Sequence, residues 1–178
     1  MENKKNIKFF SIAVVVIAVL TGLDQWTKYL AVKYLKDQAD IILIPGVFRL
    51  QYLENHGAAF GVLQNQQWLF SILTSVFLVF AFYAIYRIPK KKPFLLAYWI
   101  LTVLTAGAIG NFIDRLAQKY VVDFAYFSLI DFPIFNVADI YCTLSVAAFF
   151  LLILFGYKED QLDELFHSIL PGKKKEQE

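Results

Sequence analysis

Four long apolar runs limit what this chain can fold into more than any other feature. They cover about residues 9–30, 68–86, 94–112 and 137–155. Each run is long enough to cross roughly 30 Å of hydrocarbon at about 1.5 Å per helical residue. With 58% hydrophobic and 18% charged residues, the chain carries more apolar surface than a soluble domain of this size can bury. The sequence therefore predicts a mainly α-helical membrane protein with four transmembrane helices in a single domain, residues 1–178.

The first run follows a basic start, MENKKNIK, so a cleaved signal peptide is an alternative interpretation. No small-x-small cleavage site follows, however, and Asp24, Gln25 and Lys28 continue the helical pattern. We therefore expect a retained signal-anchor helix. Asp24 and Lys28 are four residues apart, so they share a helix face and can form an ion pair.

Lysine and arginine residues indicate the orientation of the predicted spans. They concentrate in the N-terminal arm, in the connection at 87–93 and in the tail from about residue 156, whereas the two longer connections hold fewer. The positive-inside rule then predicts that both termini are cytoplasmic. The tail combines a short amphipathic stretch with lysines at 173–175, and we expect it to be solvated or to lie on the membrane surface.

The connection between the first two spans has a different period. The sequence IPG at 44–46 predicts a turn, and residues 47–55 alternate apolar and polar side chains, which is typical of a strand or hairpin. Gly57 and Gly61 follow in a stretch of small residues. Such glycines let backbone approach a ligand closely, although a plain turn explains them more commonly.

Polar residues at membrane depth are the main functional signal, because ionisable groups there are energetically costly. The run from 107 to 139 places six such groups beside or inside predicted spans: Asn111, Asp114, Arg115, Asp123, Asn136 and Asp139. In the predicted orientation they gather, together with Asp24 and Asn55, at the outer membrane interface. The cytoplasmic halves of the spans contain no comparable group.

The third span has a small and polar stripe, Gly107, Gly110, Asn111 and Asp114, on one helix face. A helix packing seam explains the small residues but does not require Asn and Asp at its outer end. For Arg115 two interpretations stay open, an ion pair with the adjacent Asp114 or an extended side chain that reaches lipid phosphate.

Two aspartates are candidates for acid–base chemistry. Asp139 begins the fourth span three residues after Asn136, where an acidic residue is also favoured by the helix dipole alone. Asp123 lies in the strand-like run VVDF, where burial favours a protonated carboxyl group. Two carboxylates in one low-dielectric pocket share one proton, which leaves an acid and a base able to activate water against an amide bond.

Other chemistries have few candidate residues. His56 and His167 are isolated, no HExxH sequence occurs, and Cys142 lies in an apolar run without a nearby histidine. The sequence also lacks a phosphate-binding glycine loop and the interspersed basic and aromatic residues that bind nucleic acid. We therefore expect no metal, no cofactor and no nucleic-acid partner.

Five short motifs together resemble the lipoprotein signal peptidase family, also called signal peptidase II. They are DQxTK at 24–28, ENxGAAF at 54–60, GNFIDR at 110–115, VVDF at 121–124 and FNVAD at 135–139. They occur in the family's order and span most of the chain between residues 24 and 139. The resemblance implies a bacterial inner-membrane aspartic endopeptidase with four transmembrane helices and a small extracytoplasmic β cradle.

The resemblance also implies roles for single residues. Asp123 and Asp139 would be the catalytic pair, an assignment that the residues alone do not favour over Asp114. The supporting or substrate-binding positions would be Asp24, Lys28, Asn55, Gly57, Asn111, Arg115 and Asn136. The implied substrate is a prolipoprotein whose cysteine carries a diacylglyceryl group, cut just before that cysteine. Apart from the resemblance, we expect membrane lipids as further partners and a monomeric protein.

Two other classes of protein compete with this interpretation. A small four-helix transporter or channel subunit would use the aspartates as an ion path, but it should carry polar groups in both halves of the membrane. A noncatalytic scaffold would pair its acidic residues with Lys28 and Arg115. In that case charge-neutralising substitutions would impair folding rather than activity.

Overall fold

The computed structural model describes residues 2–57 and 66–170, and it contains the four predicted spans. The spanning helices are α1 (Glu2–Leu35), α2 (Gln67–Arg87), α3 (Leu95–Gln118) and α4 (Val137–Leu151), which continues as a π-helical segment, Leu152–Gly156. Within the described residues, these four are long and apolar enough to cross a membrane. The prediction of four transmembrane helices is therefore confirmed.

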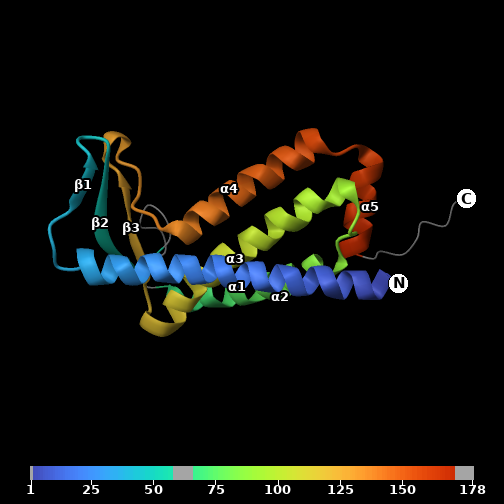
Figure 1. The fold of residues 1–178 in the computed structure, drawn as a ribbon, viewed down its shortest axis with the longest axis horizontal. Coiled ribbons are helices and arrows are strands. Elements are labelled where there is room, and N and C mark those ends of the chain that lie inside the picture. The colour runs from blue at the N-terminus through green and yellow to red at the C-terminus, as the bar shows by residue number, and fades with distance from the viewer. Residues whose placement is uncertain (1, 58–65, 171–178) are drawn as a thin grey trace, which may run out of the picture.

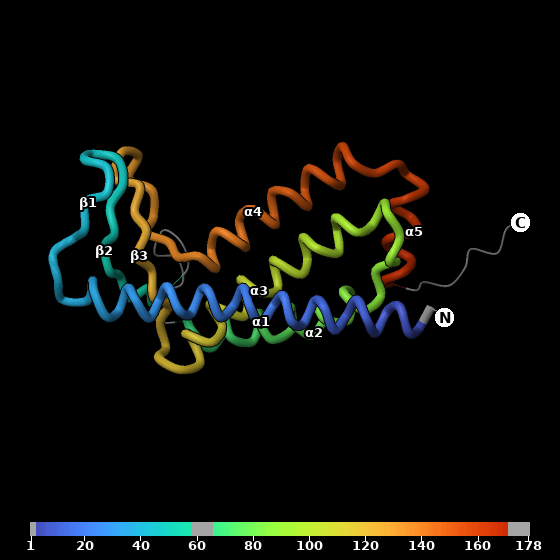
Figure 2. Tube along the Cα trace, in the orientation of Figure 1, coloured from blue at the N-terminus to red at the C-terminus, as the bar shows by residue number. Residues whose placement is uncertain are grey.

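Helix α3 is the central helix of the bundle, because it packs against α1, α2 and α4 (Figures 1 and 2). Tyr98 of α3 is fully buried, and its hydroxyl donates to the carbonyl oxygen of Phe9 at 2.6 Å. Close packing depends on the predicted small residues. A Cβ atom at Gly107 would lie 2.6 Å from the backbone oxygen of Ala138, so only glycine lets α4 approach α3 this closely.

Three antiparallel strands form a small sheet at the end of the bundle opposite the N-terminus (Figure 1). They are β1 (Ile41–Ile44), β2 (Phe48–Asn55) and β3 (Val121–Phe127), in the order β1-β2-β3. Gly46, at a φ of 72°, makes the turn between β1 and β2 that the IPG sequence predicts. The predicted hairpin and the strand-like VVDF run are therefore both present.

The chain after β3 folds back onto that strand before α4 begins. A 3-10 helix, Ser128–Ile130, starts the reversal, and Phe135 then exchanges backbone hydrogen bonds with Ala125 at 2.8 and 3.0 Å. A second 3-10 helix, Lys92–Phe94, precedes α3 at the other end of the bundle. The fold-back places the first turn of α4 beside β3, so residues of the VVDF and FNVAD motifs become neighbours.

A fifth helix, α5 (Glu159–Ile169), packs across the end of the bundle that is remote from the sheet (Figure 1). Its Leu165 is 2% exposed, and the Arg87 side chain donates to the backbone oxygen of Ser168 at 2.8 Å. The amphipathic stretch predicted in the tail is thus a docked helix rather than a solvated end. The lysines at 173–175 lie outside the described residues.

Candidate active site

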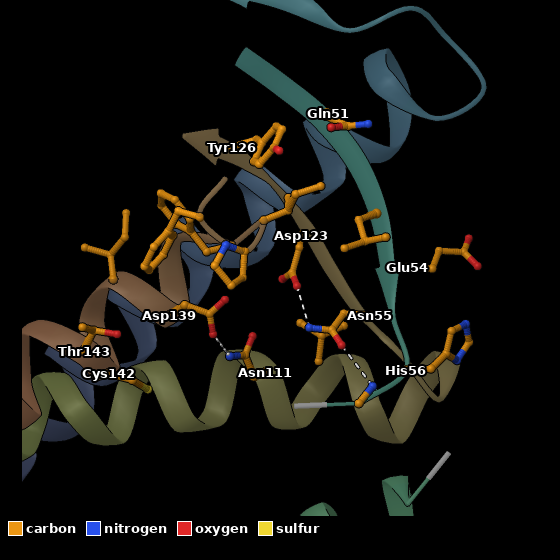
Figure 3. A pocket seen from close by; sticks show the side chains of 18 of the residues that line it. Gln51, Glu54, Asn55, His56, Asn111, Asp123, Tyr126, Asp139, Cys142 and Thr143 are labelled. Carbon is orange, nitrogen blue, oxygen red and sulfur yellow. Dashed lines mark hydrogen bonds between the residues drawn. The ribbon is translucent and has the colours of Figure 1, made fainter. Parts of the chain in front are cut away.

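A cavity of about 1100 Å³ lies where the sheet meets the ends of α3 and α4 (Figure 3). Six of the predicted site residues line this cavity: Asn55, Gly57, Asn111, Arg115, Asp123 and Asp139. The remaining three, Asp24, Lys28 and Asn136, do not line it and are at most 3% exposed. The predicted residues therefore divide into a group that faces the cavity and a buried group behind it.

Asp123 enters the cavity from β3 with both carboxylate oxygens hydrogen bonded. Oδ1 accepts from the Asn136 side chain at 2.6 Å, and Oδ2 accepts from the Asn55 side chain at 2.8 Å. The Gly57 backbone N–H in turn donates to Asn55 Oδ1 at 3.0 Å. Burial first, and then the nearby negative charge of Asp139, raise the pKa of Asp123 from its ordinary 3.8 to about 7.

Asp139 uses its two oxygens for different purposes. Oδ2 accepts from the backbone N–H of Asn136 at 3.1 Å, while Asn136 Oδ1 accepts from the backbone N–H of Asp139 at 2.9 Å. This capping box begins α4, as expected for an acidic residue in a first helical turn. Oδ1 faces the cavity and accepts from Asn111 at 2.7 Å (Figure 3). Asp139 is therefore both a helix-start residue and a site residue.

Behind the cavity, Lys28 lies between two carboxylates. Its ammonium is 2.9 Å from Asp24 and 3.1 Å from Asp114, which confirms the predicted pairing of Asp24 with Lys28. Asp24 also accepts from the backbone N–H of Ala138 at 2.8 Å, in the first turn of α4. Asp114 accepts from the backbone N–H of Val122 at 3.1 Å. These bonds join α1, α3, α4 and β3 around one buried ion cluster.

The suggested ion pair between Asp114 and Arg115 is wrong. Adjacent residues on a helix do not face each other. The Asp114 side chain turns toward Lys28 on α1, whereas the Arg115 guanidinium lies 5.1 Å from the ring centre of Phe70 on α2 and lines the cavity. Its distance from both catalytic candidates is short enough for Asp139 and Asp123 to interact with it electrostatically.

Several residues around the site were not among the predicted ones. Gln25 donates to Asp24 and Asp114 at 3.3 and 2.9 Å and so stabilises the ion cluster. Its place inside the DQxTK motif is the sequence signal that could have identified it. Arg49 and Gln51 of β2 line the cavity with Asn55. They form the polar half of the alternating strand pattern, and a sequence does not tell whether such a face meets solvent or a site.

Some of the predicted positions have no structural description. Gly61 and the residues at 58–60 of the ENxGAAF motif lie outside the described residues. Within the described part of the chain, no group of three or more His, Cys, Asp or Glu side chains is arranged to hold a metal ion.

Four spans with a pair of carboxylates in a cavity at one end define a multi-pass membrane protein of the aspartic peptidase class. Comparison with known proteins specifies the family. Residues 16–155 match the family described as Signal peptidase (SPase) II. The chain belongs to the signal peptidase II family, so it is a membrane peptidase and not a transporter or channel subunit.

Similar proteins agree with this membership. A lipoprotein signal peptidase of Brevibacillus brevis is 44% identical over 146 residues, which cover 82% of this chain and 97% of the relative. One of Streptococcus thermophilus is 46% identical, covering 82% and 92%. A solved structure of a bacterial membrane enzyme matches with a TM-score of 0.74 at 31% identity, covering 85% of this chain and 94% of that one. A second solved structure, also 31% identical, has a TM-score of 0.71 and covers 84% and 96%.

Proposed function

We propose that this peptidase removes signal peptides from diacylglyceryl-modified prolipoproteins, cutting just before the lipidated cysteine, with Asp123 and Asp139 as its catalytic pair. The observation that carries the assignment is that both carboxylates line one cavity, where burial and the charge of Asp139 raise the pKa of Asp123 to about 7. Asp114 does not line that cavity, and its carboxylate forms an ion pair with Lys28. The substrate follows from the names of the relatives, which are lipoprotein signal peptidases.

The pair works by general acid–base catalysis. At neutral pH the two carboxyl groups share one proton, because the charge of one opposes the ionisation of the other. The ionised group removes a proton from water, and the protonated group donates a hydrogen bond to the carbonyl oxygen of the scissile amide. The attack forms a tetrahedral intermediate, and the same pair then returns a proton to the leaving amine.

Neighbouring polar groups support this chemistry in different ways. Asn111 and Asn136 hold the carboxylates by hydrogen bonds, and Asn136 is only 1% exposed, so it does not reach substrate. Asn55 both contacts Asp123 and lines the cavity, so its amide is positioned to stabilise the charge that develops on the carbonyl oxygen. Arg115 supplies a positive charge at the cavity wall.

The arrangement in the membrane follows from the charge distribution. We place both termini, the 87–93 connection and α5 in the cytoplasm, and the sheet with the cavity at the outer face, because the basic residues favour this orientation. A prolipoprotein then presents its scissile bond at the outer interface while its acyl chains stay in the bilayer. The polar side chains of β2 that line the cavity, Arg49 and Gln51, are suited to contact the extended peptide. We propose that the enzyme acts as a monomer.

The first experiment incubates the purified protein in detergent with a synthetic prolipoprotein, with and without the diacylglyceryl group, beside an Asp139→Asn control. We expect cleavage before the lipidated cysteine only, and no cleavage by the control. Equal cleavage of both substrates would remove the lipid requirement from the proposal. Cleavage by a well-folded Asp139→Asn variant would remove Asp139 from the catalytic pair.

A further inference from the structure

We propose that Lys28 is a positioning residue that sets the direction of the hydrogen bonds donated to both catalytic carboxylates. The inference rests on the proposed roles of Asp123 and Asp139. Lys28 is 3% exposed and does not line the cavity, so it has no access to substrate. Its influence therefore passes through the side chains that it contacts, above all Asn111.

The direction of these hydrogen bonds follows from the chemistry of the Lys28 ammonium group, which donates three hydrogen bonds and accepts none. Lys28 Nζ lies 2.9 Å from an oxygen of Asp24, 3.1 Å from an oxygen of Asp114 and 2.9 Å from the side chain of Asn111. Only an acceptor can face this ammonium, so Asn111 must turn Oδ1 toward it. The Nδ2 group of Asn111 then points at Asp139 Oδ1, to which it donates at 2.7 Å.

The orientation of Asn111 also determines which group of Asn136 faces the second carboxylate, Asp123. Asn111 Oδ1 also faces the side chain of Asn136, and because Oδ1 is an acceptor, Asn136 must present Nδ2 to it, at 3.1 Å. The Nδ2 group of Asn136 also donates to Asp123 Oδ1 at 2.6 Å. Asn136 Oδ1 accepts from the backbone N–H of Asp139 at 2.9 Å, which only this amide orientation allows. One cation thus orients a donor toward each member of the catalytic pair.

The two carboxylates beside Lys28 hold its ammonium group in place. Asp24 is fully buried and Asp114 is 4% exposed, so an uncompensated charge here would be costly. Without the ammonium, Asn111 Oδ1 loses one of its two donors and keeps only the one from Asn136. The Asn111 amide is then held less firmly, and the hydrogen bond that it donates to Asp139 Oδ1 loses its fixed direction.

A double-mutant cycle tests whether Lys28 acts through Asn111. We would measure kcat and KM on the lipidated substrate for the wild type, Lys28→Met, Asn111→Ala and the double variant. In the wild-type background we expect Lys28→Met to lower kcat about 10- to 100-fold with KM nearly unchanged. In the Asn111→Ala background the same change should alter kcat less than about 2-fold. Lys33→Met, which removes an exposed charge from the same helix, is the matched control.

The double-mutant cycle has results that would contradict the proposed role of Lys28. An equal loss of kcat in both backgrounds would show that Lys28 acts independently of Asn111 and would overturn it. If Lys28→Met does not fold, the variant that combines Lys28→Met with Asp114→Asn takes the place of Lys28→Met in the cycle. This combination keeps the net charge of the ion cluster. If that variant also fails to fold, Lys28 is needed for folding itself, and the inference is wrong. Absence of cleavage by the wild type would instead contradict the proposed function.

Discussion

At the scale of single residues, the site separates groups that face the cavity from groups that hold them. Asp123 and Asp139 each accept two hydrogen bonds from described residues, and each still lines the cavity. Donors from three different elements are needed to hold the pair in this way. Removing either carboxylate should therefore affect the reaction much more than the fold.

We expect Asp123→Asn and Asp139→Asn each to lower kcat by about 100- to 10,000-fold, because each removes an acid or base from the reaction. Asparagine keeps the shape of the side chain, so each variant should still fold and elute in detergent like the wild type. Asp131→Asn, an exposed acidic residue of the same cavity wall, is the matched control. A wild-type rate in either aspartate variant would remove that residue from the catalytic pair.

The raised pKa of Asp123 also predicts how stability depends on pH. Its pKa is about 7 in the folded protein against an ordinary value of 3.8, so between these values the folded state binds a proton that the unfolded chain releases. The free energy of unfolding contributed by this group is therefore full at low pH and is lost as the pH rises through about 7.

Thermal unfolding of the wild type and Asp123→Asn, measured in detergent at several pH values across this window, checks the sign. Relative to the variant, the wild type should lose stability as the pH rises. A difference between the two proteins that does not change with pH would contradict the raised pKa. Activity should likewise decline above about pH 7, as the proton shared by the pair is lost.

At the scale of elements, the site depends on how closely α4 approaches α3. A Cβ atom at Gly107 would meet the backbone oxygen of Ala138 at 2.6 Å and the sulfur of Cys142 at 2.8 Å. Backbone cannot move aside as a flexible side chain can, so any larger residue must separate the two helices. Asn111 on α3 would then move away from Asp139 on α4.

Gly107→Ala should accordingly lower the free energy of unfolding by about 1 to 3 kcal/mol and reduce kcat. Gly22→Ala is the control, because no atom lies within 4 Å of the added Cβ and alanine favours helix by about 1 kcal/mol. Thermal unfolding and cleavage assays on both variants would show the contrast. Full stability and activity in Gly107→Ala would show that α4 can shift without consequence.

At the scale of the whole molecule, α5 adds a docked helix at the end of the bundle remote from the site. The match to the family ends at residue 155, so α5 lies outside the matched residues. It is held mainly by the burial of Leu165, because the pair of Lys91 with Glu164, 2.6 Å apart, is largely exposed and contributes little. Docking of α5 should therefore matter for stability and not for catalysis.

Leu165→Ala should release α5 and make it at least about tenfold more sensitive to a protease, while kcat and KM on the lipidated substrate stay unchanged. Phe166→Ala, at a position that is 50% exposed, should leave protease sensitivity near the wild-type level. Limited proteolysis followed by mass spectrometry measures both. A loss of activity in Leu165→Ala would link α5 to the distant site and contradict this separation.

Local sequence patterns predicted the four spans, strand β2 and the strand-like VVDF run, but not the two 3-10 helices or the docking of α5. Apolar runs of about 20 residues predict spans, alternation predicts β2, and a spacing of four predicts the pair of Asp24 with Lys28. Each of these features depends on residues that are close along the chain. The choice of Asp123 over Asp114 as a catalytic candidate came from the family resemblance, because both are aspartates near the outer end of a predicted span.

The contacts between distant residues needed the folded chain. Asp114 pairs with Lys28, Asn136 reaches Asp123, and the carboxylate of Asp24 caps α4 across 114 positions of sequence. Periodicity tells which face of a helix is polar but not which other element meets that face. The partners here were selected by packing, because a buried charge or amide is stable only where the surrounding elements supply its counter-charge or its hydrogen bonds.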